Sequence, residues 1–152
     1  MADVHGTRWL ILGPIACSTY CRPPSTPAEG SGGGDNVFLV TANPGTTHTA
    51  YSCAYYDHEG IVGNSPDEVL VAARDGALRK TKGTLLGEKR IEVEGYPALD
   101  TQESAGSERY DSRMIVVGKR FYIITAFART KEDREEKTVQ RVLNSFKILR
   151  KE

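Results

Sequence analysis

The hydrophobic and polar positions of the last two thirds of the chain follow two periods, one typical of strands and one typical of helices. Most segments alternate with a period of two, which is typical of strands. The segment 121–127 is apolar on both faces, so we place it in the middle of the sheet. The pattern predicts strands at 37–42, 49–57, 84–94, 98–103, 109–117 and 119–128, with the first two paired as a hairpin.

A first helix is expected from Pro66 to Lys82, where apolar residues recur at helical spacing. Ser65 and Glu68 have the spacing of a capping box, and proline suits the first helical position. Gly83 is a typical stop signal. This helix therefore carries its own start and its own end.

A second helix is expected from Lys131 to Ser145, with Thr130 as its cap. The residues 146–149 read as an extended tail that could add an edge strand. Together the elements predict an α+β fold: an antiparallel sheet of about five to seven strands packed with two helices as an α-β-α sandwich.

The first 35 residues differ in composition from the rest. Residues 22–35 are rich in proline, serine and glycine, so they predict a linker. The segment 1–35 is expected to be a disordered N-terminal segment or a weak export signal, and 36–152 a single domain. Cys17 follows a short apolar run and is a candidate for lipidation, which would attach the chain to a membrane. The alternative is an irregular N-terminus or an inaccurate start.

Composition excludes several function classes. Twenty basic residues balance twenty acidic ones, so no nucleic-acid partner is expected. Three cysteines do not make a disulfide framework, and we expect Cys53 to be a small buried residue. The histidines and cysteines lack the spacing of a zinc site, so we expect neither a metal nor a cofactor.

No nucleophile stands in a context that would supply it with a base, so no catalytic residue is expected. Arg74 and Asp75 lie side by side in the first helix. They are either an exposed charged pair or part of a structural network, in which Arg74 pairs with a strand carboxylate such as Asp100 or Glu103.

A binding surface is the remaining kind of site. Basic residues recur along the central strands, with tyrosines nearby: Lys89, Arg90, Arg109, Arg113, Lys119 and Arg120. We expect the docking surface around Tyr55, Tyr96, Arg113 and Arg120. The alternative is a pocket between helix and sheet, lined by Leu70, Tyr122 and Phe146.

Five short motifs suggest a relationship to a known family. They are Ala-Arg-Asp-Gly-Ala at 73–77, Gly-Thr-Leu-Leu-Gly-Glu-Lys at 83–89, Gly-Tyr-Pro at 95–97, Val-Gly-Lys-Arg-Phe-Tyr at 117–122 and Asn-Ser-Phe-Lys at 144–147. Their order resembles small bacterial exported or lipoprotein domains of the PsbP-like (PsbP/Mog-type) group. The resemblance implies a non-enzymatic accessory or binding domain, and it supplies no catalytic residues.

The sequence therefore predicts a non-catalytic accessory or protein-interaction domain at the cell envelope or in the periplasm, with a protein partner. A cytoplasmic location is the alternative. A small-molecule carrier and an enzyme of unknown class are the other functions left open.

Overall fold

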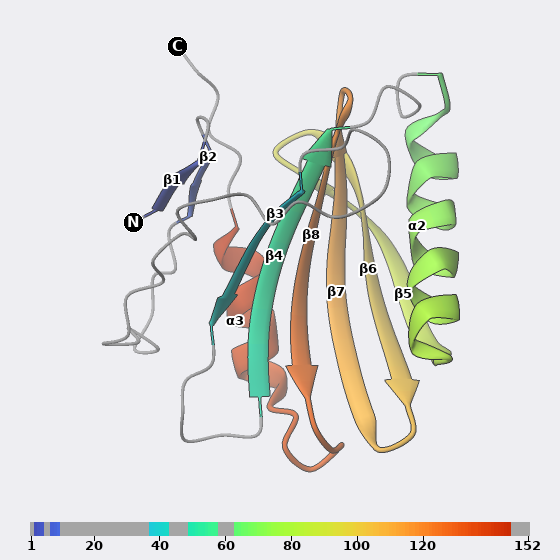
Figure 1. Cartoon of the computed structure of the whole chain (residues 1–152), viewed down its shortest axis with the longest axis vertical. Coiled ribbons are helices and arrows are strands. Elements are labelled where there is room, and N and C mark those ends of the chain that lie inside the picture. The colour runs from blue at the N-terminus through green and yellow to red at the C-terminus, as the bar shows by residue number, and fades with distance from the viewer. Residues whose placement is uncertain (1, 5–6, 10–36, 43–48, 58–62, 147–152) are drawn as a thin grey trace.

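The computed structural model describes residues 2–4, 7–9, 37–42, 49–57 and 63–146, with side chains at 49–55 and 63–146. Its main body is one antiparallel sheet of six strands in the order β3-β4-β8-β7-β6-β5 (Figure 1). β1 (Ala2–Val4) and β2 (Thr7–Trp9) form a separate pair. The six strands are β3 (Val37–Ala42), β4 (Thr49–Asp57), β5 (Thr84–Val93), β6 (Tyr96–Ala105), β7 (Glu108–Val117) and β8 (Arg120–Ala128).

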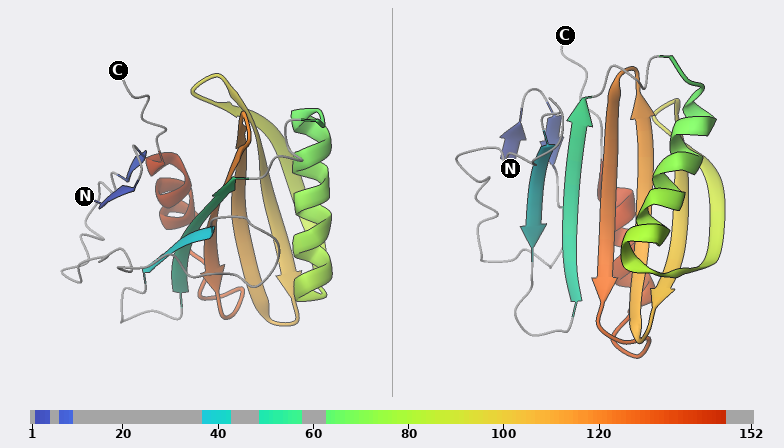
Figure 2. Two further views of the ribbon diagram at one scale, coloured as in Figure 1. Left: turned by 45° about the horizontal axis from the view of Figure 1, so that its top comes forward. Right: turned by 45° about the vertical axis from the view of Figure 1, so that its right-hand side comes forward.

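Two helices cover opposite faces of this sheet, so the predicted α-β-α sandwich is confirmed (Figure 2). On β7, Ile115 points toward α3 (Glu136–Ser145), whereas its neighbour Met114 points toward α2 (Pro66–Thr81). We call these sides the α3 face and the α2 face. The core of the α3 face is Cys53, Tyr55, Ala98, Ile115, Tyr122, Ile124, Ala126, Val139, Leu143 and Phe146; that of the α2 face is Leu70, Leu99, Met114, Val116 and Phe121.

α2 begins as its local sequence dictates. The Ser65 hydroxyl accepts a hydrogen bond from the Glu68 backbone at 3.2 Å, and the Glu68 carboxylate accepts one from the Ser65 backbone at 2.9 Å. This capping box satisfies two backbone donors at the helix start. At the other end Lys82 takes the left-handed conformation, with φ 55°, and the next residue, Gly83, donates to the Leu78 carbonyl.

α3 begins later than its sequence suggests, at Glu136 instead of Lys131. Thr130 does accept a hydrogen bond from the Asp133 backbone at 3.2 Å, but this turn is not continued as a helix. Arg134 donates two hydrogen bonds to Asp111 of β7. This contact holds the chain along the sheet before the helix begins. The cap expected at Thr130 therefore closes a connecting turn.

The strand predictions hold with small changes of length. β8, the segment predicted to be central, lies between β4 and β7, and β3 pairs with β4 as a hairpin. Residues 94 and 95 make a two-residue turn in which both φ angles are positive, at 53° and 85°. Such a turn suits the twist of a hairpin, and it brings β6 back along β5. The expected tail strand at 147–149 lies outside the described residues, as does the linker at 22–35.

Candidate functional site: a polar groove beside helix α3

A groove of about 470 Å³ lies on the α3 face, between α3 and the outer strands β5 and β6. It forms because α3 packs over β7 and β8 and leaves the outer strands uncovered on this side (Figure 2). β5 is the last strand of the sheet, and no described strand pairs with its outer edge. The lining residues are Gly87, Glu88, Lys89, Ile91, Asp100, Thr101, Gln102, Asp111, Arg113, Gln140, Leu143 and Asn144.

Arg113 anchors the groove at its inner wall. Its guanidinium donates two parallel hydrogen bonds to the Asp100 carboxylate, at 2.7 and 2.8 Å. The same group donates to the carbonyl of Leu143 and to the Asn144 side-chain oxygen, both at 3.0 Å. It therefore satisfies acceptors at the C-terminal end of α3, where a positive charge is favoured. Arg113 is only 8% exposed, so this is a structural role.

Asp111 makes a second ion pair of the same kind. Arg134 donates to its two carboxylate oxygens at 2.7 and 2.8 Å, and Asp111 is 3% exposed. The hydrogen bond from Arg134 to Asp111 raises the pKa of that guanidinium, and Glu136 adds to the effect. Glu136 in turn has a lowered pKa because Arg134 bonds to its carboxylate. The Arg134–Asp111 ion pair and the hydrogen bonds that Arg113 donates to α3 thus hold the helix against the sheet.

Other polar groups of the groove remain available to a ligand. Lys89 and Gln102 are exposed, and neither forms an ion pair or side-chain hydrogen bond with the described residues. Asn144 uses its oxygen on Arg113, which leaves its amide N–H groups as donors. Gln140 donates to Glu136 at 3.1 Å, which leaves its side-chain oxygen as an acceptor. The groove therefore combines one ammonium group with three amides.

The four residues predicted as a docking surface all lie on the α3 face, but they do not form one open surface. Tyr55 is 6% exposed, and the Arg120 guanidinium lies over its ring at 4.4 Å. Tyr96 is half-buried and packs against the core. Arg113 is engaged with Asp100 and α3, as described above. Arg113 alone of the four contributes to the groove.

The predicted pocket between helix and sheet is not formed by the expected residues. Leu70 belongs to the α2 face, whereas Tyr122 and Phe146 belong to the α3 face, where their ring centroids lie 5.3 Å apart. All three side chains are fully packed, with 1 to 4% exposure. Sequence periodicity cannot tell a packed aromatic side chain from one that lines a cavity.

Arg74 pairs with a different strand carboxylate from the ones expected. Arg74 pairs with Asp75 at 2.8 Å and with Glu88 of β5 at 2.7 Å. The strand carboxylate proposed for it, Asp100, points to the other face and binds Arg113, and Glu103 makes no ion pair with described residues. Arg74 thus contacts its neighbour Asp75, as in the first alternative, and also a strand carboxylate, Glu88, that the sequence analysis did not name.

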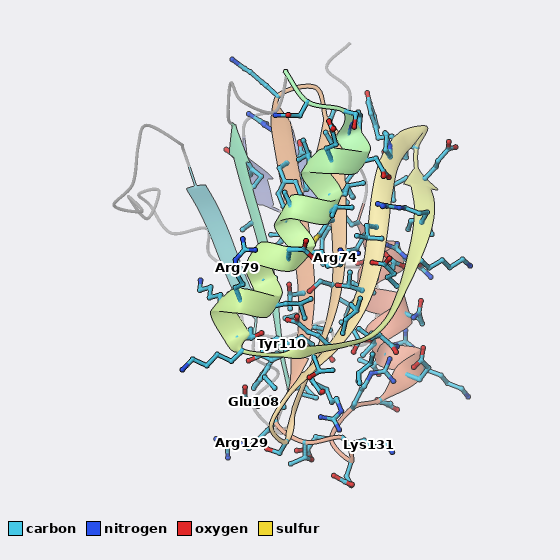
Figure 3. All side chains as sticks on the ribbon, turned by 90° about the vertical axis from the view of Figure 1, so that its right-hand side faces the viewer. Arg74, Arg79, Glu108, Tyr110, Arg129 and Lys131 are labelled. Carbon is cyan, nitrogen blue, oxygen red and sulfur yellow. The ribbon has the colours of Figure 1, made fainter. Side chains whose placement is uncertain are left out.

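The α2 face also carries titratable side chains with raised pKa values, near the C-terminal end of α2 (Figure 3). Burial raises the pKa of Tyr110 to about 12, helped by its hydrogen bond to Glu108 at 2.7 Å. Glu103 lies opposite Tyr110 in the sheet, and its pKa is raised because burial disfavours the charged form. Figure 3 also places Arg79, Arg129 and Lys131 around this end of the molecule.

Cysteine chemistry contributes little to the described part of the chain. Cys53 is free and 2% exposed, as predicted, and burial raises the pKa of its thiol well above the usual value. Cys17 lies outside the described residues, so its lipidation stays a prediction. No group of three or more metal-ligating side chains occurs in the searched residues. Among these residues there is also no helix long and apolar enough to cross a membrane.

Sequence reasoning missed Gln102, Gln140 and Asn144 as lining residues. One signal was present: Gln140 and Asn144 are four residues apart and therefore share a helix face. Lys89 was noted as one of several basic residues, without a reason to prefer it. Its alternation with Ile91 on β5 places both on the α3 face, but only the packing of α3 shows that a groove lies there.

Comparisons with known proteins show the fold and leave the family open. No protein-family model matches the sequence, and no curated protein matches it significantly. A solved structure with a similar fold is that of PA94 from Pseudomonas aeruginosa, a protein of unknown function for which a regulatory role has been suggested. It is 16% identical, with a TM-score of 0.54, over 84% of this chain and 90% of that one. The resemblance to PsbP-like domains therefore stays a prediction.

Proposed function

We propose that this protein is a non-catalytic binding domain that receives an extended segment of a partner protein in the groove beside α3. The observation that carries the proposal is the combination of two features. A groove of about 470 Å³ with available polar groups runs beside β5, and the outer edge of β5 pairs with no described strand. An extended segment can add to such an edge by main-chain hydrogen bonds while its side chains enter the groove.

The charges of the groove support binding in preference to catalysis. A general acid or base must be able to reach a substrate proton. Here the carboxylates of Asp100 and Asp111 are each held by two hydrogen bonds from an arginine. These ion pairs make a rigid wall and leave the amides and Lys89 for recognition.

A small-molecule carrier is the second candidate, because the volume of the groove lies in the range of small-ligand pockets. The uncovered strand edge favours the peptide segment, since a small ligand would leave the main-chain groups of β5 unused. A location at the cell envelope belongs to the same proposal, because lipidation of Cys17 would attach the chain to a membrane.

The test is a selection of ten-residue peptides displayed on phage, followed by binding measurements with two blocked variants. A Cβ at Gly87 would meet no atom within 4 Å, so Gly87→Phe should fill the groove without straining the strand. Gly63→Phe is the matched control, because Gly63 has the same free space in the loop before α2. Gln102→Trp is a second blocking variant at an exposed position.

We expect the selected peptides to bind the wild type and Gly63→Phe equally, and to lose at least about tenfold in affinity on Gly87→Phe and Gln102→Trp. All variants are first checked for an unchanged unfolding midpoint in urea. Peptides that bind all four proteins alike would place the binding surface elsewhere and overturn the proposal.

A further inference from the structure

Of the three consecutive charged residues in the middle of β5, 88–90, two form ion pairs with α2 and one does not. On the α2 face, Glu88 pairs with Arg74 at 2.7 Å, and Arg90 pairs with Asp67 at 3.1 Å. Lys89 lies between them, exposed on the α3 face, and forms no ion pair with the described residues. Helix α2 therefore satisfies two of the three charges, and the third faces the groove.

The sheet register places an acid near Lys89 without pairing the two. Asp100 lies directly opposite Lys89 on β6. Its carboxylate is turned to Arg113 and receives two hydrogen bonds there. Asp111, a second acid of the groove, is held in the same way by Arg134, and the third, Glu88, pairs with Arg74. The groove thus has one uncompensated positive charge, on the strand that forms its outer rim.

The neighbours of Lys89 on the same face define two further positions. Ile91 is half-buried and extends the apolar core toward the rim. At Gly87 there is no side chain, and nothing lies within 4 Å of where a Cβ would stand. Side chains directly opposite each other on neighbouring strands interact, and opposite charges there are favourable. An added strand would therefore meet an apolar, a positive and an empty position in turn.

We infer that the groove selects a partner strand with an acidic residue opposite Lys89, an apolar residue opposite Ile91 and a large residue opposite Gly87. This rests on the proposed function and names the partner class for the same site. Every pair in the sheet is antiparallel, so the segment reads apolar, any, acidic, any, large from its N-terminal end. The acid is a side chain inside the segment, because Lys89 lies in the middle of β5.

The large residue has polar groups to meet at the floor of the groove. Gln102 lies opposite Gly87 on β6, and its exposed amide can both donate and accept. Asn144 offers donors and Gln140 an acceptor from α3. An aromatic side chain with a hydroxyl group would match this floor.

The experiment is an NMR titration of the labelled full chain with two blocked synthetic peptides. One is acetyl-Thr-Val-Thr-Glu-Thr-Tyr-Thr-amide, and the other has Lys in place of Glu. They are tested on the wild type and on Lys89→Glu. The control is Lys80→Glu, which makes the same charge change at an exposed position on α2.

We expect the acidic peptide to shift the β5 amides and to bind about tenfold more tightly than the basic one, because an attraction replaces a repulsion. Lys89→Glu should reverse the preference, and Lys80→Glu should leave it unchanged. Raising the salt from about 0.1 M to about 1 M should reduce the difference, since the pair is exposed.

The failures of the two proposals are distinguishable. Equal binding of both peptides at β5 would overturn the charge selection and leave the docking groove intact. Shifts confined to other strands would overturn the inference, and the phage-selected peptides would then decide whether the groove binds at all. If those peptides bind Gly87→Phe as tightly as the wild type, the proposed docking function is overturned as well.

Discussion

The two helices of this domain are fixed by different means. Local residues specify both ends of α2: Ser65 and Glu68 cap its start, and the left-handed residue Lys82 ends it. α3 has no side-chain cap at Glu135, its first flanking residue. Instead, two residues of β7 hold it: Asp111 forms an ion pair with Arg134 just before the helix, and Arg113 donates hydrogen bonds to its last turn.

This difference separates local from long-range information. A capping box joins residues three apart, whereas Arg113 and Asn144 are 31 positions apart in the sequence. The placement of α3, and with it the groove, therefore depends on contacts that form only when the sheet is complete. The side of the molecule that holds the groove is therefore the one that local sequence specifies least.

The strongest test of this comparison removes the contact at the end of α3. Arg113→Met should lower the free energy of unfolding by about 3 kcal/mol, because it leaves the Asp100 carboxylate and the Leu143 carbonyl of α3 without their donor. Removing one partner of a buried ion pair costs about 3 to 5 kcal/mol. We take the low end of this range because the Asp100 side chain is 23% exposed. Urea unfolding measures the loss, and hydrogen exchange should show faster opening in α3 than in α2.

The double variant Arg113→Met with Asp100→Leu is the control for this change. It also removes the Asp100 carboxylate, which the single variant leaves without a donor, so more than half of the lost stability should return. A loss below about 1 kcal/mol for the single variant would mean that apolar packing alone positions α3, and the contrast between the helices would disappear.

The complementary change tests the local signal of α2. Ser65→Ala should cost about 1 kcal/mol, because the backbone N–H of Glu68 loses its acceptor. Hydrogen exchange should accelerate in the first turn of α2 and remain unchanged in α3. Ser65→Asp keeps an acceptor and should retain most of the stability. If Ser65→Ala also loosens α3, the two faces are coupled and cannot be treated separately.

The fold could be predicted from the sequence where the signals are short-range. The capping box, the alternation of the strands and the doubly apolar segment of β8 each required only neighbouring residues. The start of α3 was predicted too early, because Thr130 carries a local cap signal. A contact between Arg134 and Asp111, 23 positions apart, decides the outcome there.

The groove could not be predicted for the same reason. Its lining comes from β5, β6, β7 and α3, and its shape depends on how far α3 extends over the sheet. Arg113 was predicted as part of an exposed docking surface. That it is buried and paired with Asp100 follows from the register of β6 and β7, which alternation alone does not fix.

The smallest expected effect concerns Glu103, a carboxyl group on the α2 face that is 7% exposed and has no ion pair among the described residues. Burial raises its pKa in the folded chain above the model value of 4.5. The folded state therefore binds the proton more tightly than the unfolded state. As the pH rises from about 4.5 through the raised pKa, this contribution to stability is lost, and at neutral pH the ionised group is destabilising.

Glu103→Gln removes the charge and should stabilise the domain at pH 7 by about 0.5 to 1 kcal/mol. The advantage should shrink as the pH falls, and it should vanish near pH 4, where the wild-type carboxyl group is also neutral. Urea unfolding at a series of pH values measures it, with Glu92→Gln on the exposed part of β5 as the control. The pKa of Tyr110, about 12 in the wild type, should fall in Glu103→Gln, because the carboxylate opposite it contributes to the shift. Parallel stability curves for variant and wild type would show that Glu103 is solvated well enough to ionise freely and that its charge does not oppose the fold.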